Sequence, residues 1–428
     1  MTTRRPVRWI AVLCTLMLVL VACASSEDSG DDGDDGGSDE KPATLQSDVG
    51  FSGDENGGTI TLGILTPQTT AFAALGEQVT NGNKLYWDAL NAEGGIAGKY
   101  QVELVEADTE YAGEKARSEY QRIKGDVAMF GQVLGTEVTN NLLPLMEDDE
   151  YAGAPATLDA EWVTMPNLAP VLAPYQIEII NGAAYYGDTE GFDGKNACVI
   201  KQDDSYGDAG QEGADFAATE LGFDIKTSAS FATGDDMTAQ IQQLQDNECD
   251  VVFQASTLID SPSIWGRAEA VGFTPRWIGL GPAWSSSFAE GDLASYIKDN
   301  VWIVAEDGAS LDESIPGVKQ MLDQRDQFAP DTAINLFSLF GYVSAWGTAQ
   351  ILEKAFDNND VTPAGIVKAI NEEQTLTFDG AAGDYEYGPD RSPPRVNAIF
   401  TAADSSEDTG LAVVELTVES DAAKNYSF

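Results

Sequence analysis

The sequence predicts an α/β protein with two Rossmann-like lobes, each a doubly wound parallel sheet, joined by a three-strand hinge. Short apolar runs that are typical of buried strands alternate with amphipathic helical segments, which is the pattern of parallel sheets covered by helices on both faces. The alternation stops after residue 148 and starts again at residue 197, and this indicates two lobes. A length of 428 residues, of which 43% are hydrophobic, suffices for two or three domains with cores of their own.

The first lobe begins with a strand over 59–65 (TITLGIL), which has turn residues on both sides. A helix follows over 72–91, because apolar residues recur there at helical spacing, and Gly94 and Gly95 end it. The same reasoning predicts the other elements of this lobe: a strand at 100–106, a helix at 113–124, a strand at 127–130 and a helix at 136–148.

A helix over 177–186 is expected to open the second lobe. Strands and helices then alternate in the order 197–201, 208–221, 224–231, 236–247, 250–255, 261–271 and 276–280. Two long helices are predicted near the end of the chain, at 314–328 and 335–356. The candidate crossing strands of the hinge are 172–174, 301–305 and 378–387. These elements assign 58–174 with 306–380 to the N-terminal lobe, and 175–305 with 381–428 to the C-terminal lobe.

Residues 1–22 are predicted to form a signal peptide. Arginines near the start precede an apolar stretch over 9–20, which is too short to span a bilayer, since a spanning helix needs about 20 residues. Val21 and Ala22 precede Cys23, and this arrangement resembles the bacterial lipobox, whose cysteine is lipidated and becomes the mature N-terminus. An ordinary secretory signal with a chance cysteine is the alternative interpretation.

Residues 23–57 are predicted to form an acidic, disordered tether. The segment 24–40 (ASSEDSGDDGDDGGSDE) has no apolar residue larger than alanine, so burial cannot offset the entropy lost on ordering. Repulsion between its carboxylates keeps such a segment extended. The tether is expected to hold the folded part away from the membrane to which Cys23 is anchored.

The charge and the motifs exclude several classes of function. A formal net charge of −48 argues against nucleic acid as a partner, because phosphate binding depends on clustered Lys and Arg. The chain has no histidine, which excludes every His-based catalytic triad and every His-ligated zinc site. It also contains no GxSxG, P-loop, HExxH or CxxC motif. The sequence therefore predicts no enzymatic activity, no cofactor and no metal.

The four cysteines predict one disulfide. Cys14 leaves with the signal peptide and Cys23 carries the lipid, so Cys198 and Cys249 remain. Cys198 opens one predicted strand and Cys249 directly precedes another. The first and third strands of a doubly wound unit are neighbours, so both cysteines would lie at the same edge of the sheet. In an oxidising compartment they are expected to form a disulfide, with two buried free thiols as the alternative.

Five segments share their order and their motifs with a known family: 91–98 (NAEGGIAG), 131–136 (GQVLGT), 203–208 (DDSYGD), 235–252 and 378–383 (FDGAAG). They resemble the type I periplasmic binding proteins, specifically the leucine/isoleucine/valine-binding group of ABC-importer receptors. The resemblance covers about 58–400, which is nearly all of the predicted folded part.

The resemblance implies a ligand site between the lobes, where loops converge at the carboxyl ends of the strands. Thr136 aligns with the residue that hydrogen-bonds a ligand carboxylate at a helix N-terminus, where free N–H groups favour an anion. Its alternative role is a plain helix cap. Thr157 falls where the family contacts the same end of the ligand. Tyr206 aligns with the tyrosine that closes over the ligand, and its alternative role is a turn residue packed on the lobe surface.

Four more candidates follow predicted strands. Thr66, Gln68 and Phe72 come after the first strand and are expected to line the mouth of the cleft. Thr257 follows the strand predicted at 250–255 and is a candidate for the second-lobe wall.

The partner of a ligand ammonium group is left open. Ala283 and Trp284 fall at the loop where amino-acid binders of this family often have a glutamate, and no acidic residue stands there. Trp284 offers an aromatic face to a ligand or anchors the lobe surface. Asp159 and Asp204 are alternative ammonium partners, although aspartate in such places usually caps a turn. The expected ligand is a hydrophobic amino acid, an amide, an aromatic or branched carboxylate, or another small polar molecule.

The resemblance implies a lipid-anchored, extracytoplasmic, monomeric solute-binding protein of an ABC importer. Its expected partners are a small-molecule ligand, the permease subunits in the membrane and the membrane itself, through Cys23. Two alternatives stay open: a ligand-sensing receptor module of the same fold, and a surface lipoprotein that binds no ligand.

Overall fold

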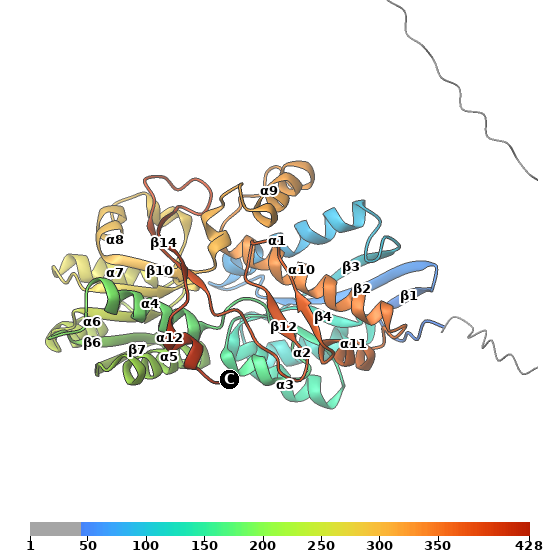
Figure 1. Ribbon diagram of the computed structural model, residues 1–428, viewed down its shortest axis with the longest axis horizontal. Coiled ribbons are helices and arrows are strands. Elements are labelled where there is room, and N and C mark those ends of the chain that lie inside the picture. The colour runs from blue at the N-terminus through green and yellow to red at the C-terminus, as the bar shows by residue number, and fades with distance from the viewer. Residues whose placement is uncertain (1–43) are drawn as a thin grey trace, which may run out of the picture. The chain divides into compact units, whose positions relative to one another are not determined.

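The computed structural model describes residues 44–428. The predicted signal peptide, the lipidation at Cys23 and the tether up to residue 43 lie outside the described residues. The described chain folds into two α/β lobes, each built around its own sheet (Figure 1). The predicted fold class is thereby confirmed. No helix in this part of the chain is long and apolar enough to cross a membrane.

The first-lobe sheet consists of β1 (Phe51–Asp54), β2 (Gly57–Thr66), β3 (Tyr100–Asp108), β4 (Met129–Leu134) and β5 (Gly153–Ala156). The order β3-β2-β4-β5 is parallel throughout, and β1 pairs antiparallel with the first half of β2. Because β2 pairs with both β3 and β4, the winding reverses beside β2, and the crevice at the carboxyl ends of these strands is where such sheets bind ligands.

Residues 44–56 belong to the folded unit, so the predicted tether ends earlier than residue 57. β1 and β2 form a hairpin in which Phe51 lies opposite Ile60. The ring of Phe51 contacts Tyr100 and Phe356 edge-on, each at 5.9 Å between centroids. A short, mostly exposed hairpin needs few apolar residues, so its Gly- and Asp-rich composition is hard to distinguish from that of a disordered segment.

The helices placed with the first lobe are α1 (Ala73–Ala92), α2 (Gly113–Ile123), α3 (Thr136–Asp148), α9 (Pro316–Phe328), α10 (Leu336–Asp357) and α11 (Pro363–Ile370). Two glycines bring α1 and α10 into backbone contact. A Cβ on Gly82 would lie 1.9 Å from the carbonyl oxygen of Ser338, and one on Gly341 would lie 1.9 Å from that of Val79. This close crossing fixes the apolar side chains at the start of both helices.

The second-lobe sheet has seven strands: β6 (Ala197–Gln202), β7 (Ile225–Phe231), β8 (Val251–Ala255), β9 (Arg276–Leu280), β10 (Val301–Ala305), β13 (Asn397–Ala402) and β14 (Leu411–Val418). The order is β14-β13-β10-β9-β8-β6-β7, parallel from β7 to β10 and antiparallel for β13 and β14. Strands β13 and β14 were not predicted from the sequence.

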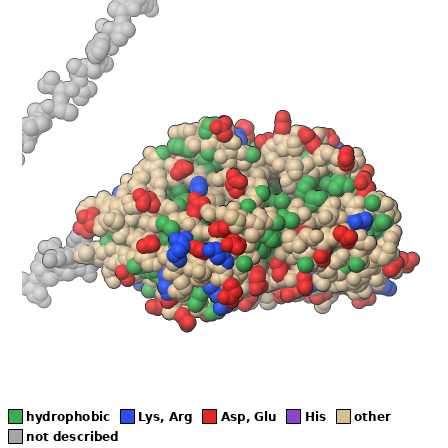
Figure 2. All heavy atoms as spheres, turned by 180° about the vertical axis from the view of Figure 1, so that it is seen from behind, with side chains coloured by type: hydrophobic (Ala, Val, Ile, Leu, Met, Phe, Trp, Pro, Cys, Tyr) green, Lys and Arg blue, Asp and Glu red, His purple; other side chains and the backbone are tan. Residues whose placement is uncertain are grey.

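The second lobe has six helices in the described chain: α4 (Tyr175–Thr189), α5 (Ser205–Leu221), α6 (Thr238–Asp246), α7 (Ser261–Ala270), α8 (Ala294–Asn300) and α12 (Asp421–Asn425). Short 3-10 helices occur at Lys124–Asp126, Ala160–Thr164, Gly281–Ala283, Ser286–Ala289 and Asp307–Ser310. Figure 2 shows acidic side chains spread over one face of the molecule, in keeping with the strongly negative net charge.

The chain crosses between the lobes through irregular segments, and the expectation of three crossing strands is wrong in this detail. Residues 172–174 form no strand, and 301–305 is β10, inside the second-lobe sheet. Of 378–387, only β12 (Tyr385–Tyr387) is a strand, and it pairs with β11 (Gln374–Leu376) in a small separate sheet.

Hydrogen bonds join the first crossing segment to the third. The hydroxyl of Tyr387 donates to the carbonyl oxygen of Pro170 at 2.5 Å. The guanidinium of Arg391 donates to the carbonyl oxygens of Met165 and Leu168 at 3.1 and 3.0 Å. These hydrogen bonds connect the first crossing segment to the third.

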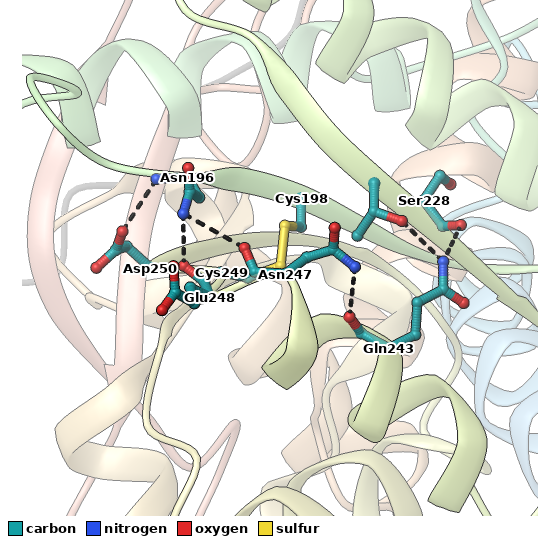
Figure 3. Close-up of a disulfide and its surroundings, with 9 residues drawn as sticks. Asn196, Cys198, Ser228, Gln243, Asn247, Glu248, Cys249 and Asp250 are labelled. Carbon is teal, nitrogen blue, oxygen red and sulfur yellow. Dashed lines mark hydrogen bonds between the residues drawn. A yellow bond between two sulfur atoms is a disulfide. The ribbon is translucent and has the colours of Figure 1, made fainter.

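The predicted disulfide between Cys198 and Cys249 is present, with Cα atoms 5.9 Å apart (Figure 3). It joins β6 to the residue that leads into β8, and these two strands are neighbours in the sheet, as expected. Asn196 and Asp250 continue the connection, because the Asn196 N–H donates to the Asp250 carboxylate at 2.9 Å. All four residues lie at the amino ends of the parallel strands.

Candidate ligand-binding site

A cavity lies between the two lobes at the carboxyl ends of their parallel strands. It holds about 660 Å³ of empty space, including its opening to solvent. The first lobe contributes α1, α10 and the segments after β4 and β5, and the second lobe contributes α4, α5 and the segments after β8, β9 and β10. The site therefore stands where both doubly wound sheets present their loops.

The first-lobe wall is largely apolar. It is formed by Leu75, Val79, Leu134, Ala156, Leu336, Phe337 and Phe340. Five of these form one small hydrophobic cluster, and Phe340 packs against its edge. Such a wall favours the apolar part of a ligand, because burying hydrocarbon yields about 25 cal/mol per Å².

Two threonines add polar groups to this wall. Thr136 is the first residue of α3, and the hydroxyls of Thr136 and Thr157 lie 2.6 Å apart in a hydrogen bond that either can donate. The residue before α3 is Gly135, at φ 106°, and no side chain caps the helix. The first-turn N–H groups and the two hydroxyls together form a place that favours an anionic group.

The second-lobe wall carries the tyrosines. Tyr175 and Tyr206 meet edge to face with ring centroids 5.0 Å apart, and both line the cavity. The Tyr206 hydroxyl donates to the carbonyl oxygen of Ser256 at 2.9 Å, and its side chain is 3% exposed. Tyr206 therefore lines the cavity while its hydroxyl is bound to the lobe itself.

Two glutamates line the same wall, and neither was predicted from the sequence. Glu178 lies in the first turn of α4 and accepts a hydrogen bond from the Gly281 N–H at 3.4 Å, and Glu306 directly follows β10. Burial, reinforced by the charge of Glu306, raises the pKa of the Glu178 carboxyl well above its ordinary value. Glu178 could have been predicted from the sequence, because it interrupts an apolar helical run of isoleucines. A carboxylate is rarely found in such a buried run unless it is paired or has a function.

Thr257 completes this wall. It follows β8, is 3% exposed and lines the cavity. Its buried hydroxyl oxygen has no hydrogen-bond partner in the described structure. Such an atom is costly to leave unpaired, so it marks a position where a ligand atom completes the pairing.

Comparison with known proteins decides the family. The model of a family described as periplasmic binding protein matches residues 59–408. The chain belongs to this family. The family consists of solute-binding proteins, so a ligand cavity between two lobes is the feature expected of a member. No curated protein matches the chain at a significant level.

Solved structures show the same fold. A fatty acid ABC transporter substrate-binding protein from Thermomonospora curvata has a TM-score of 0.80 and 23% identity, over 89% of this chain and 97% of that one. A branched-chain amino acid ABC transporter from Thermus thermophilus with bound valine has a TM-score of 0.70 and 15% identity, over 86% and 98%. A substrate-binding protein from Streptococcus pneumoniae in complex with isoleucine has a TM-score of 0.65 and 18% identity, over 83% and 99%.

The structure of this periplasmic binding protein brings four of the predicted site residues to the cavity: Thr136, Thr157, Tyr206 and Thr257. Phe72 does not line it, but stacks at 3.9 Å on Tyr111, which does.

Two candidates from the end of β2 face elsewhere. Thr66 is buried and hydrogen-bonds within the lobe, to Gly76 and Thr80. Gln68 is exposed and donates to the Glu106 carboxylate at 3.0 Å. Both line a separate hollow on the first lobe.

The three remaining acidic and aromatic candidates also lie away from the cavity lining. Asp159 accepts from Gln176 at 3.0 Å and caps a 3-10 helix, and Asp204 caps α5 by accepting from the Gly207 N–H at 3.0 Å. Trp284 is 1% exposed, and its indole N–H donates to the carbonyl oxygen of Thr409 at 2.7 Å. The cap and anchor roles are therefore the ones observed.

Proposed function

We propose that the chain is the substrate-binding protein of an ABC importer and captures a small hydrophobic carboxylic acid between its lobes. The class includes branched-chain and other hydrophobic amino acids as well as acids without an amino group. The observation that supports it is the combination of an apolar first-lobe wall with the threonine pair at the N-terminus of α3.

The ligand carboxylate would lie at Thr136 and Thr157, and the hydrocarbon would pack on α1 and α10. A hydrogen bond to a charged group contributes about 1.5–3 kcal/mol, and full burial of a leucine-sized side chain contributes a similar amount. Two structural neighbours agree with this class, since one is a fatty acid ABC transporter substrate-binding protein and the other contains bound valine. Both ligands combine a carboxylate with an apolar group.

Closure of the lobes would convert binding into a signal. Ligand contacts with both walls stabilise the closed arrangement relative to the open one. A hydrogen bond already joins the lobes at the rim, where the Ser205 hydroxyl donates to the Glu137 carboxylate of α3 at 3.3 Å. We propose that the closed form is presented to a membrane permease by a chain exported through its signal peptide and anchored at Cys23. No chemical step is required of the protein.

The test is a ligand screen by thermal shift and calorimetry on the full chain. The panel holds leucine, valine, phenylalanine, 4-methylpentanoate, benzoate and decanoate, with leucinamide and urea as compounds that lack a carboxylate. A ligand at 100 times its dissociation constant adds about 2.7 kcal/mol of stability, which raises the melting temperature measurably.

A matched pair of variants tests the carboxylate site. Thr136→Val is expected to weaken binding of the carboxylates by about tenfold to a hundredfold, from the loss of one charged hydrogen bond. Thr139→Val is the control, because Thr139 is buried in the same helix but donates to Gly135 and lies away from the cavity. Equal binding of leucine and leucinamide, or equal loss of affinity in both variants, would refute the proposed site.

A further inference from the structure

Tyr111 lines the ligand cavity from the segment between β3 and α2, and it was not predicted from the sequence. Its ring packs against the backbone of Gly135, because a Cβ placed on that glycine would lie 2.6 Å from a ring carbon. Gly135 directly precedes Thr136, so the ring borders the threonine pair at the N-terminus of α3. The inference drawn from this contact rests on the proposed function, because it concerns the carboxylate end of the same ligand.

Phe72 holds the ring from another loop of the first lobe. The rings of Phe72 and Tyr111 are stacked, with centroids 3.9 Å apart and planes 13° apart. Phe72 is 9% exposed and stands directly before α1. Both neighbours of the Tyr111 ring, Phe72 and Gly135, belong to the first lobe. The position of the ring therefore does not depend on closure of the lobes.

The backbone that carries the ring is anchored as well. Glu110 and Tyr111 have φ angles of 52° and 55°, in the left-handed region that consecutive non-glycine residues rarely adopt. The carboxylate of Asp108 accepts a hydrogen bond from the Glu110 N–H at 2.9 Å. It also accepts from the Gln68 N–H at 2.8 Å and the Thr69 hydroxyl at 2.7 Å, both in the loop between β2 and α1. Strained backbone that its surroundings hold in place is typical of functional positions.

A ring fixed at this place limits the room beside the ligand carboxylate. When the carboxylate lies at Thr136, the carbon next to the carboxyl group, the α-carbon, must lie near the Tyr111 ring. Extra methyl groups in a packed site force side chains or backbone to move. One methylene that does not fit a hydrophobic pocket changes affinity by about 10–200-fold.

We propose that Tyr111 is a specificity-determining residue, whose ring excludes carboxylic acids with a fully substituted α-carbon. Acids such as 4-methylpentanoate and leucine, which keep at least one hydrogen on that carbon, fit beside the ring. Phe72 is a positioning residue, since it does not line the cavity and acts through Tyr111.

The experiment compares two pairs of ligands that differ only in methyl groups on the α-carbon. The pairs are 4-methylpentanoate with 2,2,4-trimethylpentanoate, and leucine with 2-methylleucine. Calorimetry on the full chain gives the ratio of affinities within each pair. The wild-type protein is expected to prefer the less substituted member by about tenfold or more. A preference much smaller than this would overturn the proposal.

Tyr111→Ala tests the ring directly. A general loss of affinity cancels in the ratio, so only a specific role of the ring changes it. The ratio is expected to fall toward equal binding in Tyr111→Ala and to stay high in Tyr111→Phe, which keeps the ring. An unchanged ratio in Tyr111→Ala would overturn the proposal. If Tyr111→Ala does not fold, the wild-type ratio and the variants of Phe72 still decide.

Phe72→Leu and Phe356→Leu form a matched pair. Phe356 stacks on Tyr100 at 3.8 Å between centroids in the same lobe, and neither Phe356 nor Phe72 lines the cavity. Phe72→Leu is expected to lower the ratio because the Tyr111 ring loses its support, whereas Phe356→Leu is expected to keep the wild-type ratio. Equal ratios in these two variants would overturn the role of Phe72.

The failures are distinguishable. If 4-methylpentanoate or leucine binds in a Thr136-dependent way and its methylated analogue binds equally well, the proposed function stands and this inference falls. If no member of either pair binds a protein that melts cooperatively, this inference is refuted. The other carboxylates of the thermal-shift panel then decide separately whether the proposed ligand class stands.

Discussion

Removal of the disulfide is expected to destabilise the second lobe without impairing ligand binding. The double variant Cys198→Ala with Cys249→Ala opens a loop whose ends are 51 residues apart. In the chain-entropy description of crosslinks, closing a loop of this length in the unfolded chain corresponds to about 4 kcal/mol at 25 °C. Binding should persist, because the bridge lies at the amino ends of β6 and β8, whereas the cavity lies at their carboxyl ends, about 17 Å away along a five-residue strand.

Urea unfolding, followed by the fluorescence of the buried tryptophans, measures the loss for the full chain. A matched control is to reduce both proteins, since a reductant should lower the unfolding midpoint of the wild type and leave that of the double variant unchanged. The reasoning is refuted if the double variant loses less than about 1 kcal/mol. It is equally refuted if a folded double variant no longer binds a ligand that the wild type binds, because the disulfide would then act on the site.

Two further predictions concern the α1–α10 contact and the buried carboxyl. Gly341→Ala should cost about 1–3 kcal/mol in urea unfolding, since its Cβ would lie 1.9 Å from the Val79 carbonyl oxygen. Gly266→Ala should not destabilise, because its Cβ would make only ordinary contacts with the Leu293 side chain, at 3.7 Å or more. An equal effect at both positions would contradict the packing argument. Burial raises the pKa of the Glu178 carboxyl. The folded protein therefore keeps a proton that the unfolded chain loses near pH 4.5. As a result, the free energy of unfolding falls as the pH rises from the unfolded-state pKa toward the raised pKa of the folded state. Melting temperatures against pH should show this slope in wild type and in Glu161→Gln, whose side chain is exposed, but not in Glu178→Gln, and an unchanged slope in Glu178→Gln would contradict the assignment.

The alternating part of the fold could be predicted closely from the sequence. The helix predicted at 136–148 and the strands predicted at 276–280 and 301–305 have the bounds that the structure shows. A parallel strand buried on both faces is a continuous apolar run, and the helix that must follow it has a different period. Apolar strand runs and helical periodicity alternate along the chain, so the end of each strand or helix is marked by the start of the next element.

The missed strands lack that alternation. β5 reads GAPA, and small residues with a proline resemble a turn more than a strand. β13 and β14 pair antiparallel with no helix between them. The alternation of strands and helices that located the other strands therefore ends before these two strands begin. Their β-branched and aromatic residues (NAIFTA and LAVVELTV) were the signal that remained.

Strand ends predicted where the site lies, but not which side chains face it. Thr257 follows the end of β8 and Thr66 ends β2, and only Thr257 faces the cavity. The side chain of Thr66 is turned into the first lobe by its hydrogen bonds with Gly76 and Thr80. Such hydrogen bonds join residues that are distant in the sequence, so they cannot be predicted from the pattern of a single strand.

Glu306 was missed for a related reason. The run 301–305 was predicted to be a crossing strand, and a residue that follows a crossing strand is not a candidate for a ligand site. The same run is in fact a parallel strand of the second-lobe sheet, and its carboxyl end faces the cavity beside those of β8 and β9. Correct assignment of that one strand would have made Glu306 a candidate.

The position of the acidic group follows from how charges act. The resemblance implied that an ammonium partner would lie in the loop after β9, where Ala283 and Trp284 stand and where Trp284 is a buried anchor. Coulomb attraction depends on distance and dielectric, not on the element that supplies the charge. In a cavity bounded by several strand ends, a carboxylate at the start of α4 or after β10 can therefore contact a ligand ammonium group as well as a carboxylate in the loop after β9 could. Here Glu178 and Glu306 line the cavity from these two places, and none of the described lining residues is a lysine or an arginine.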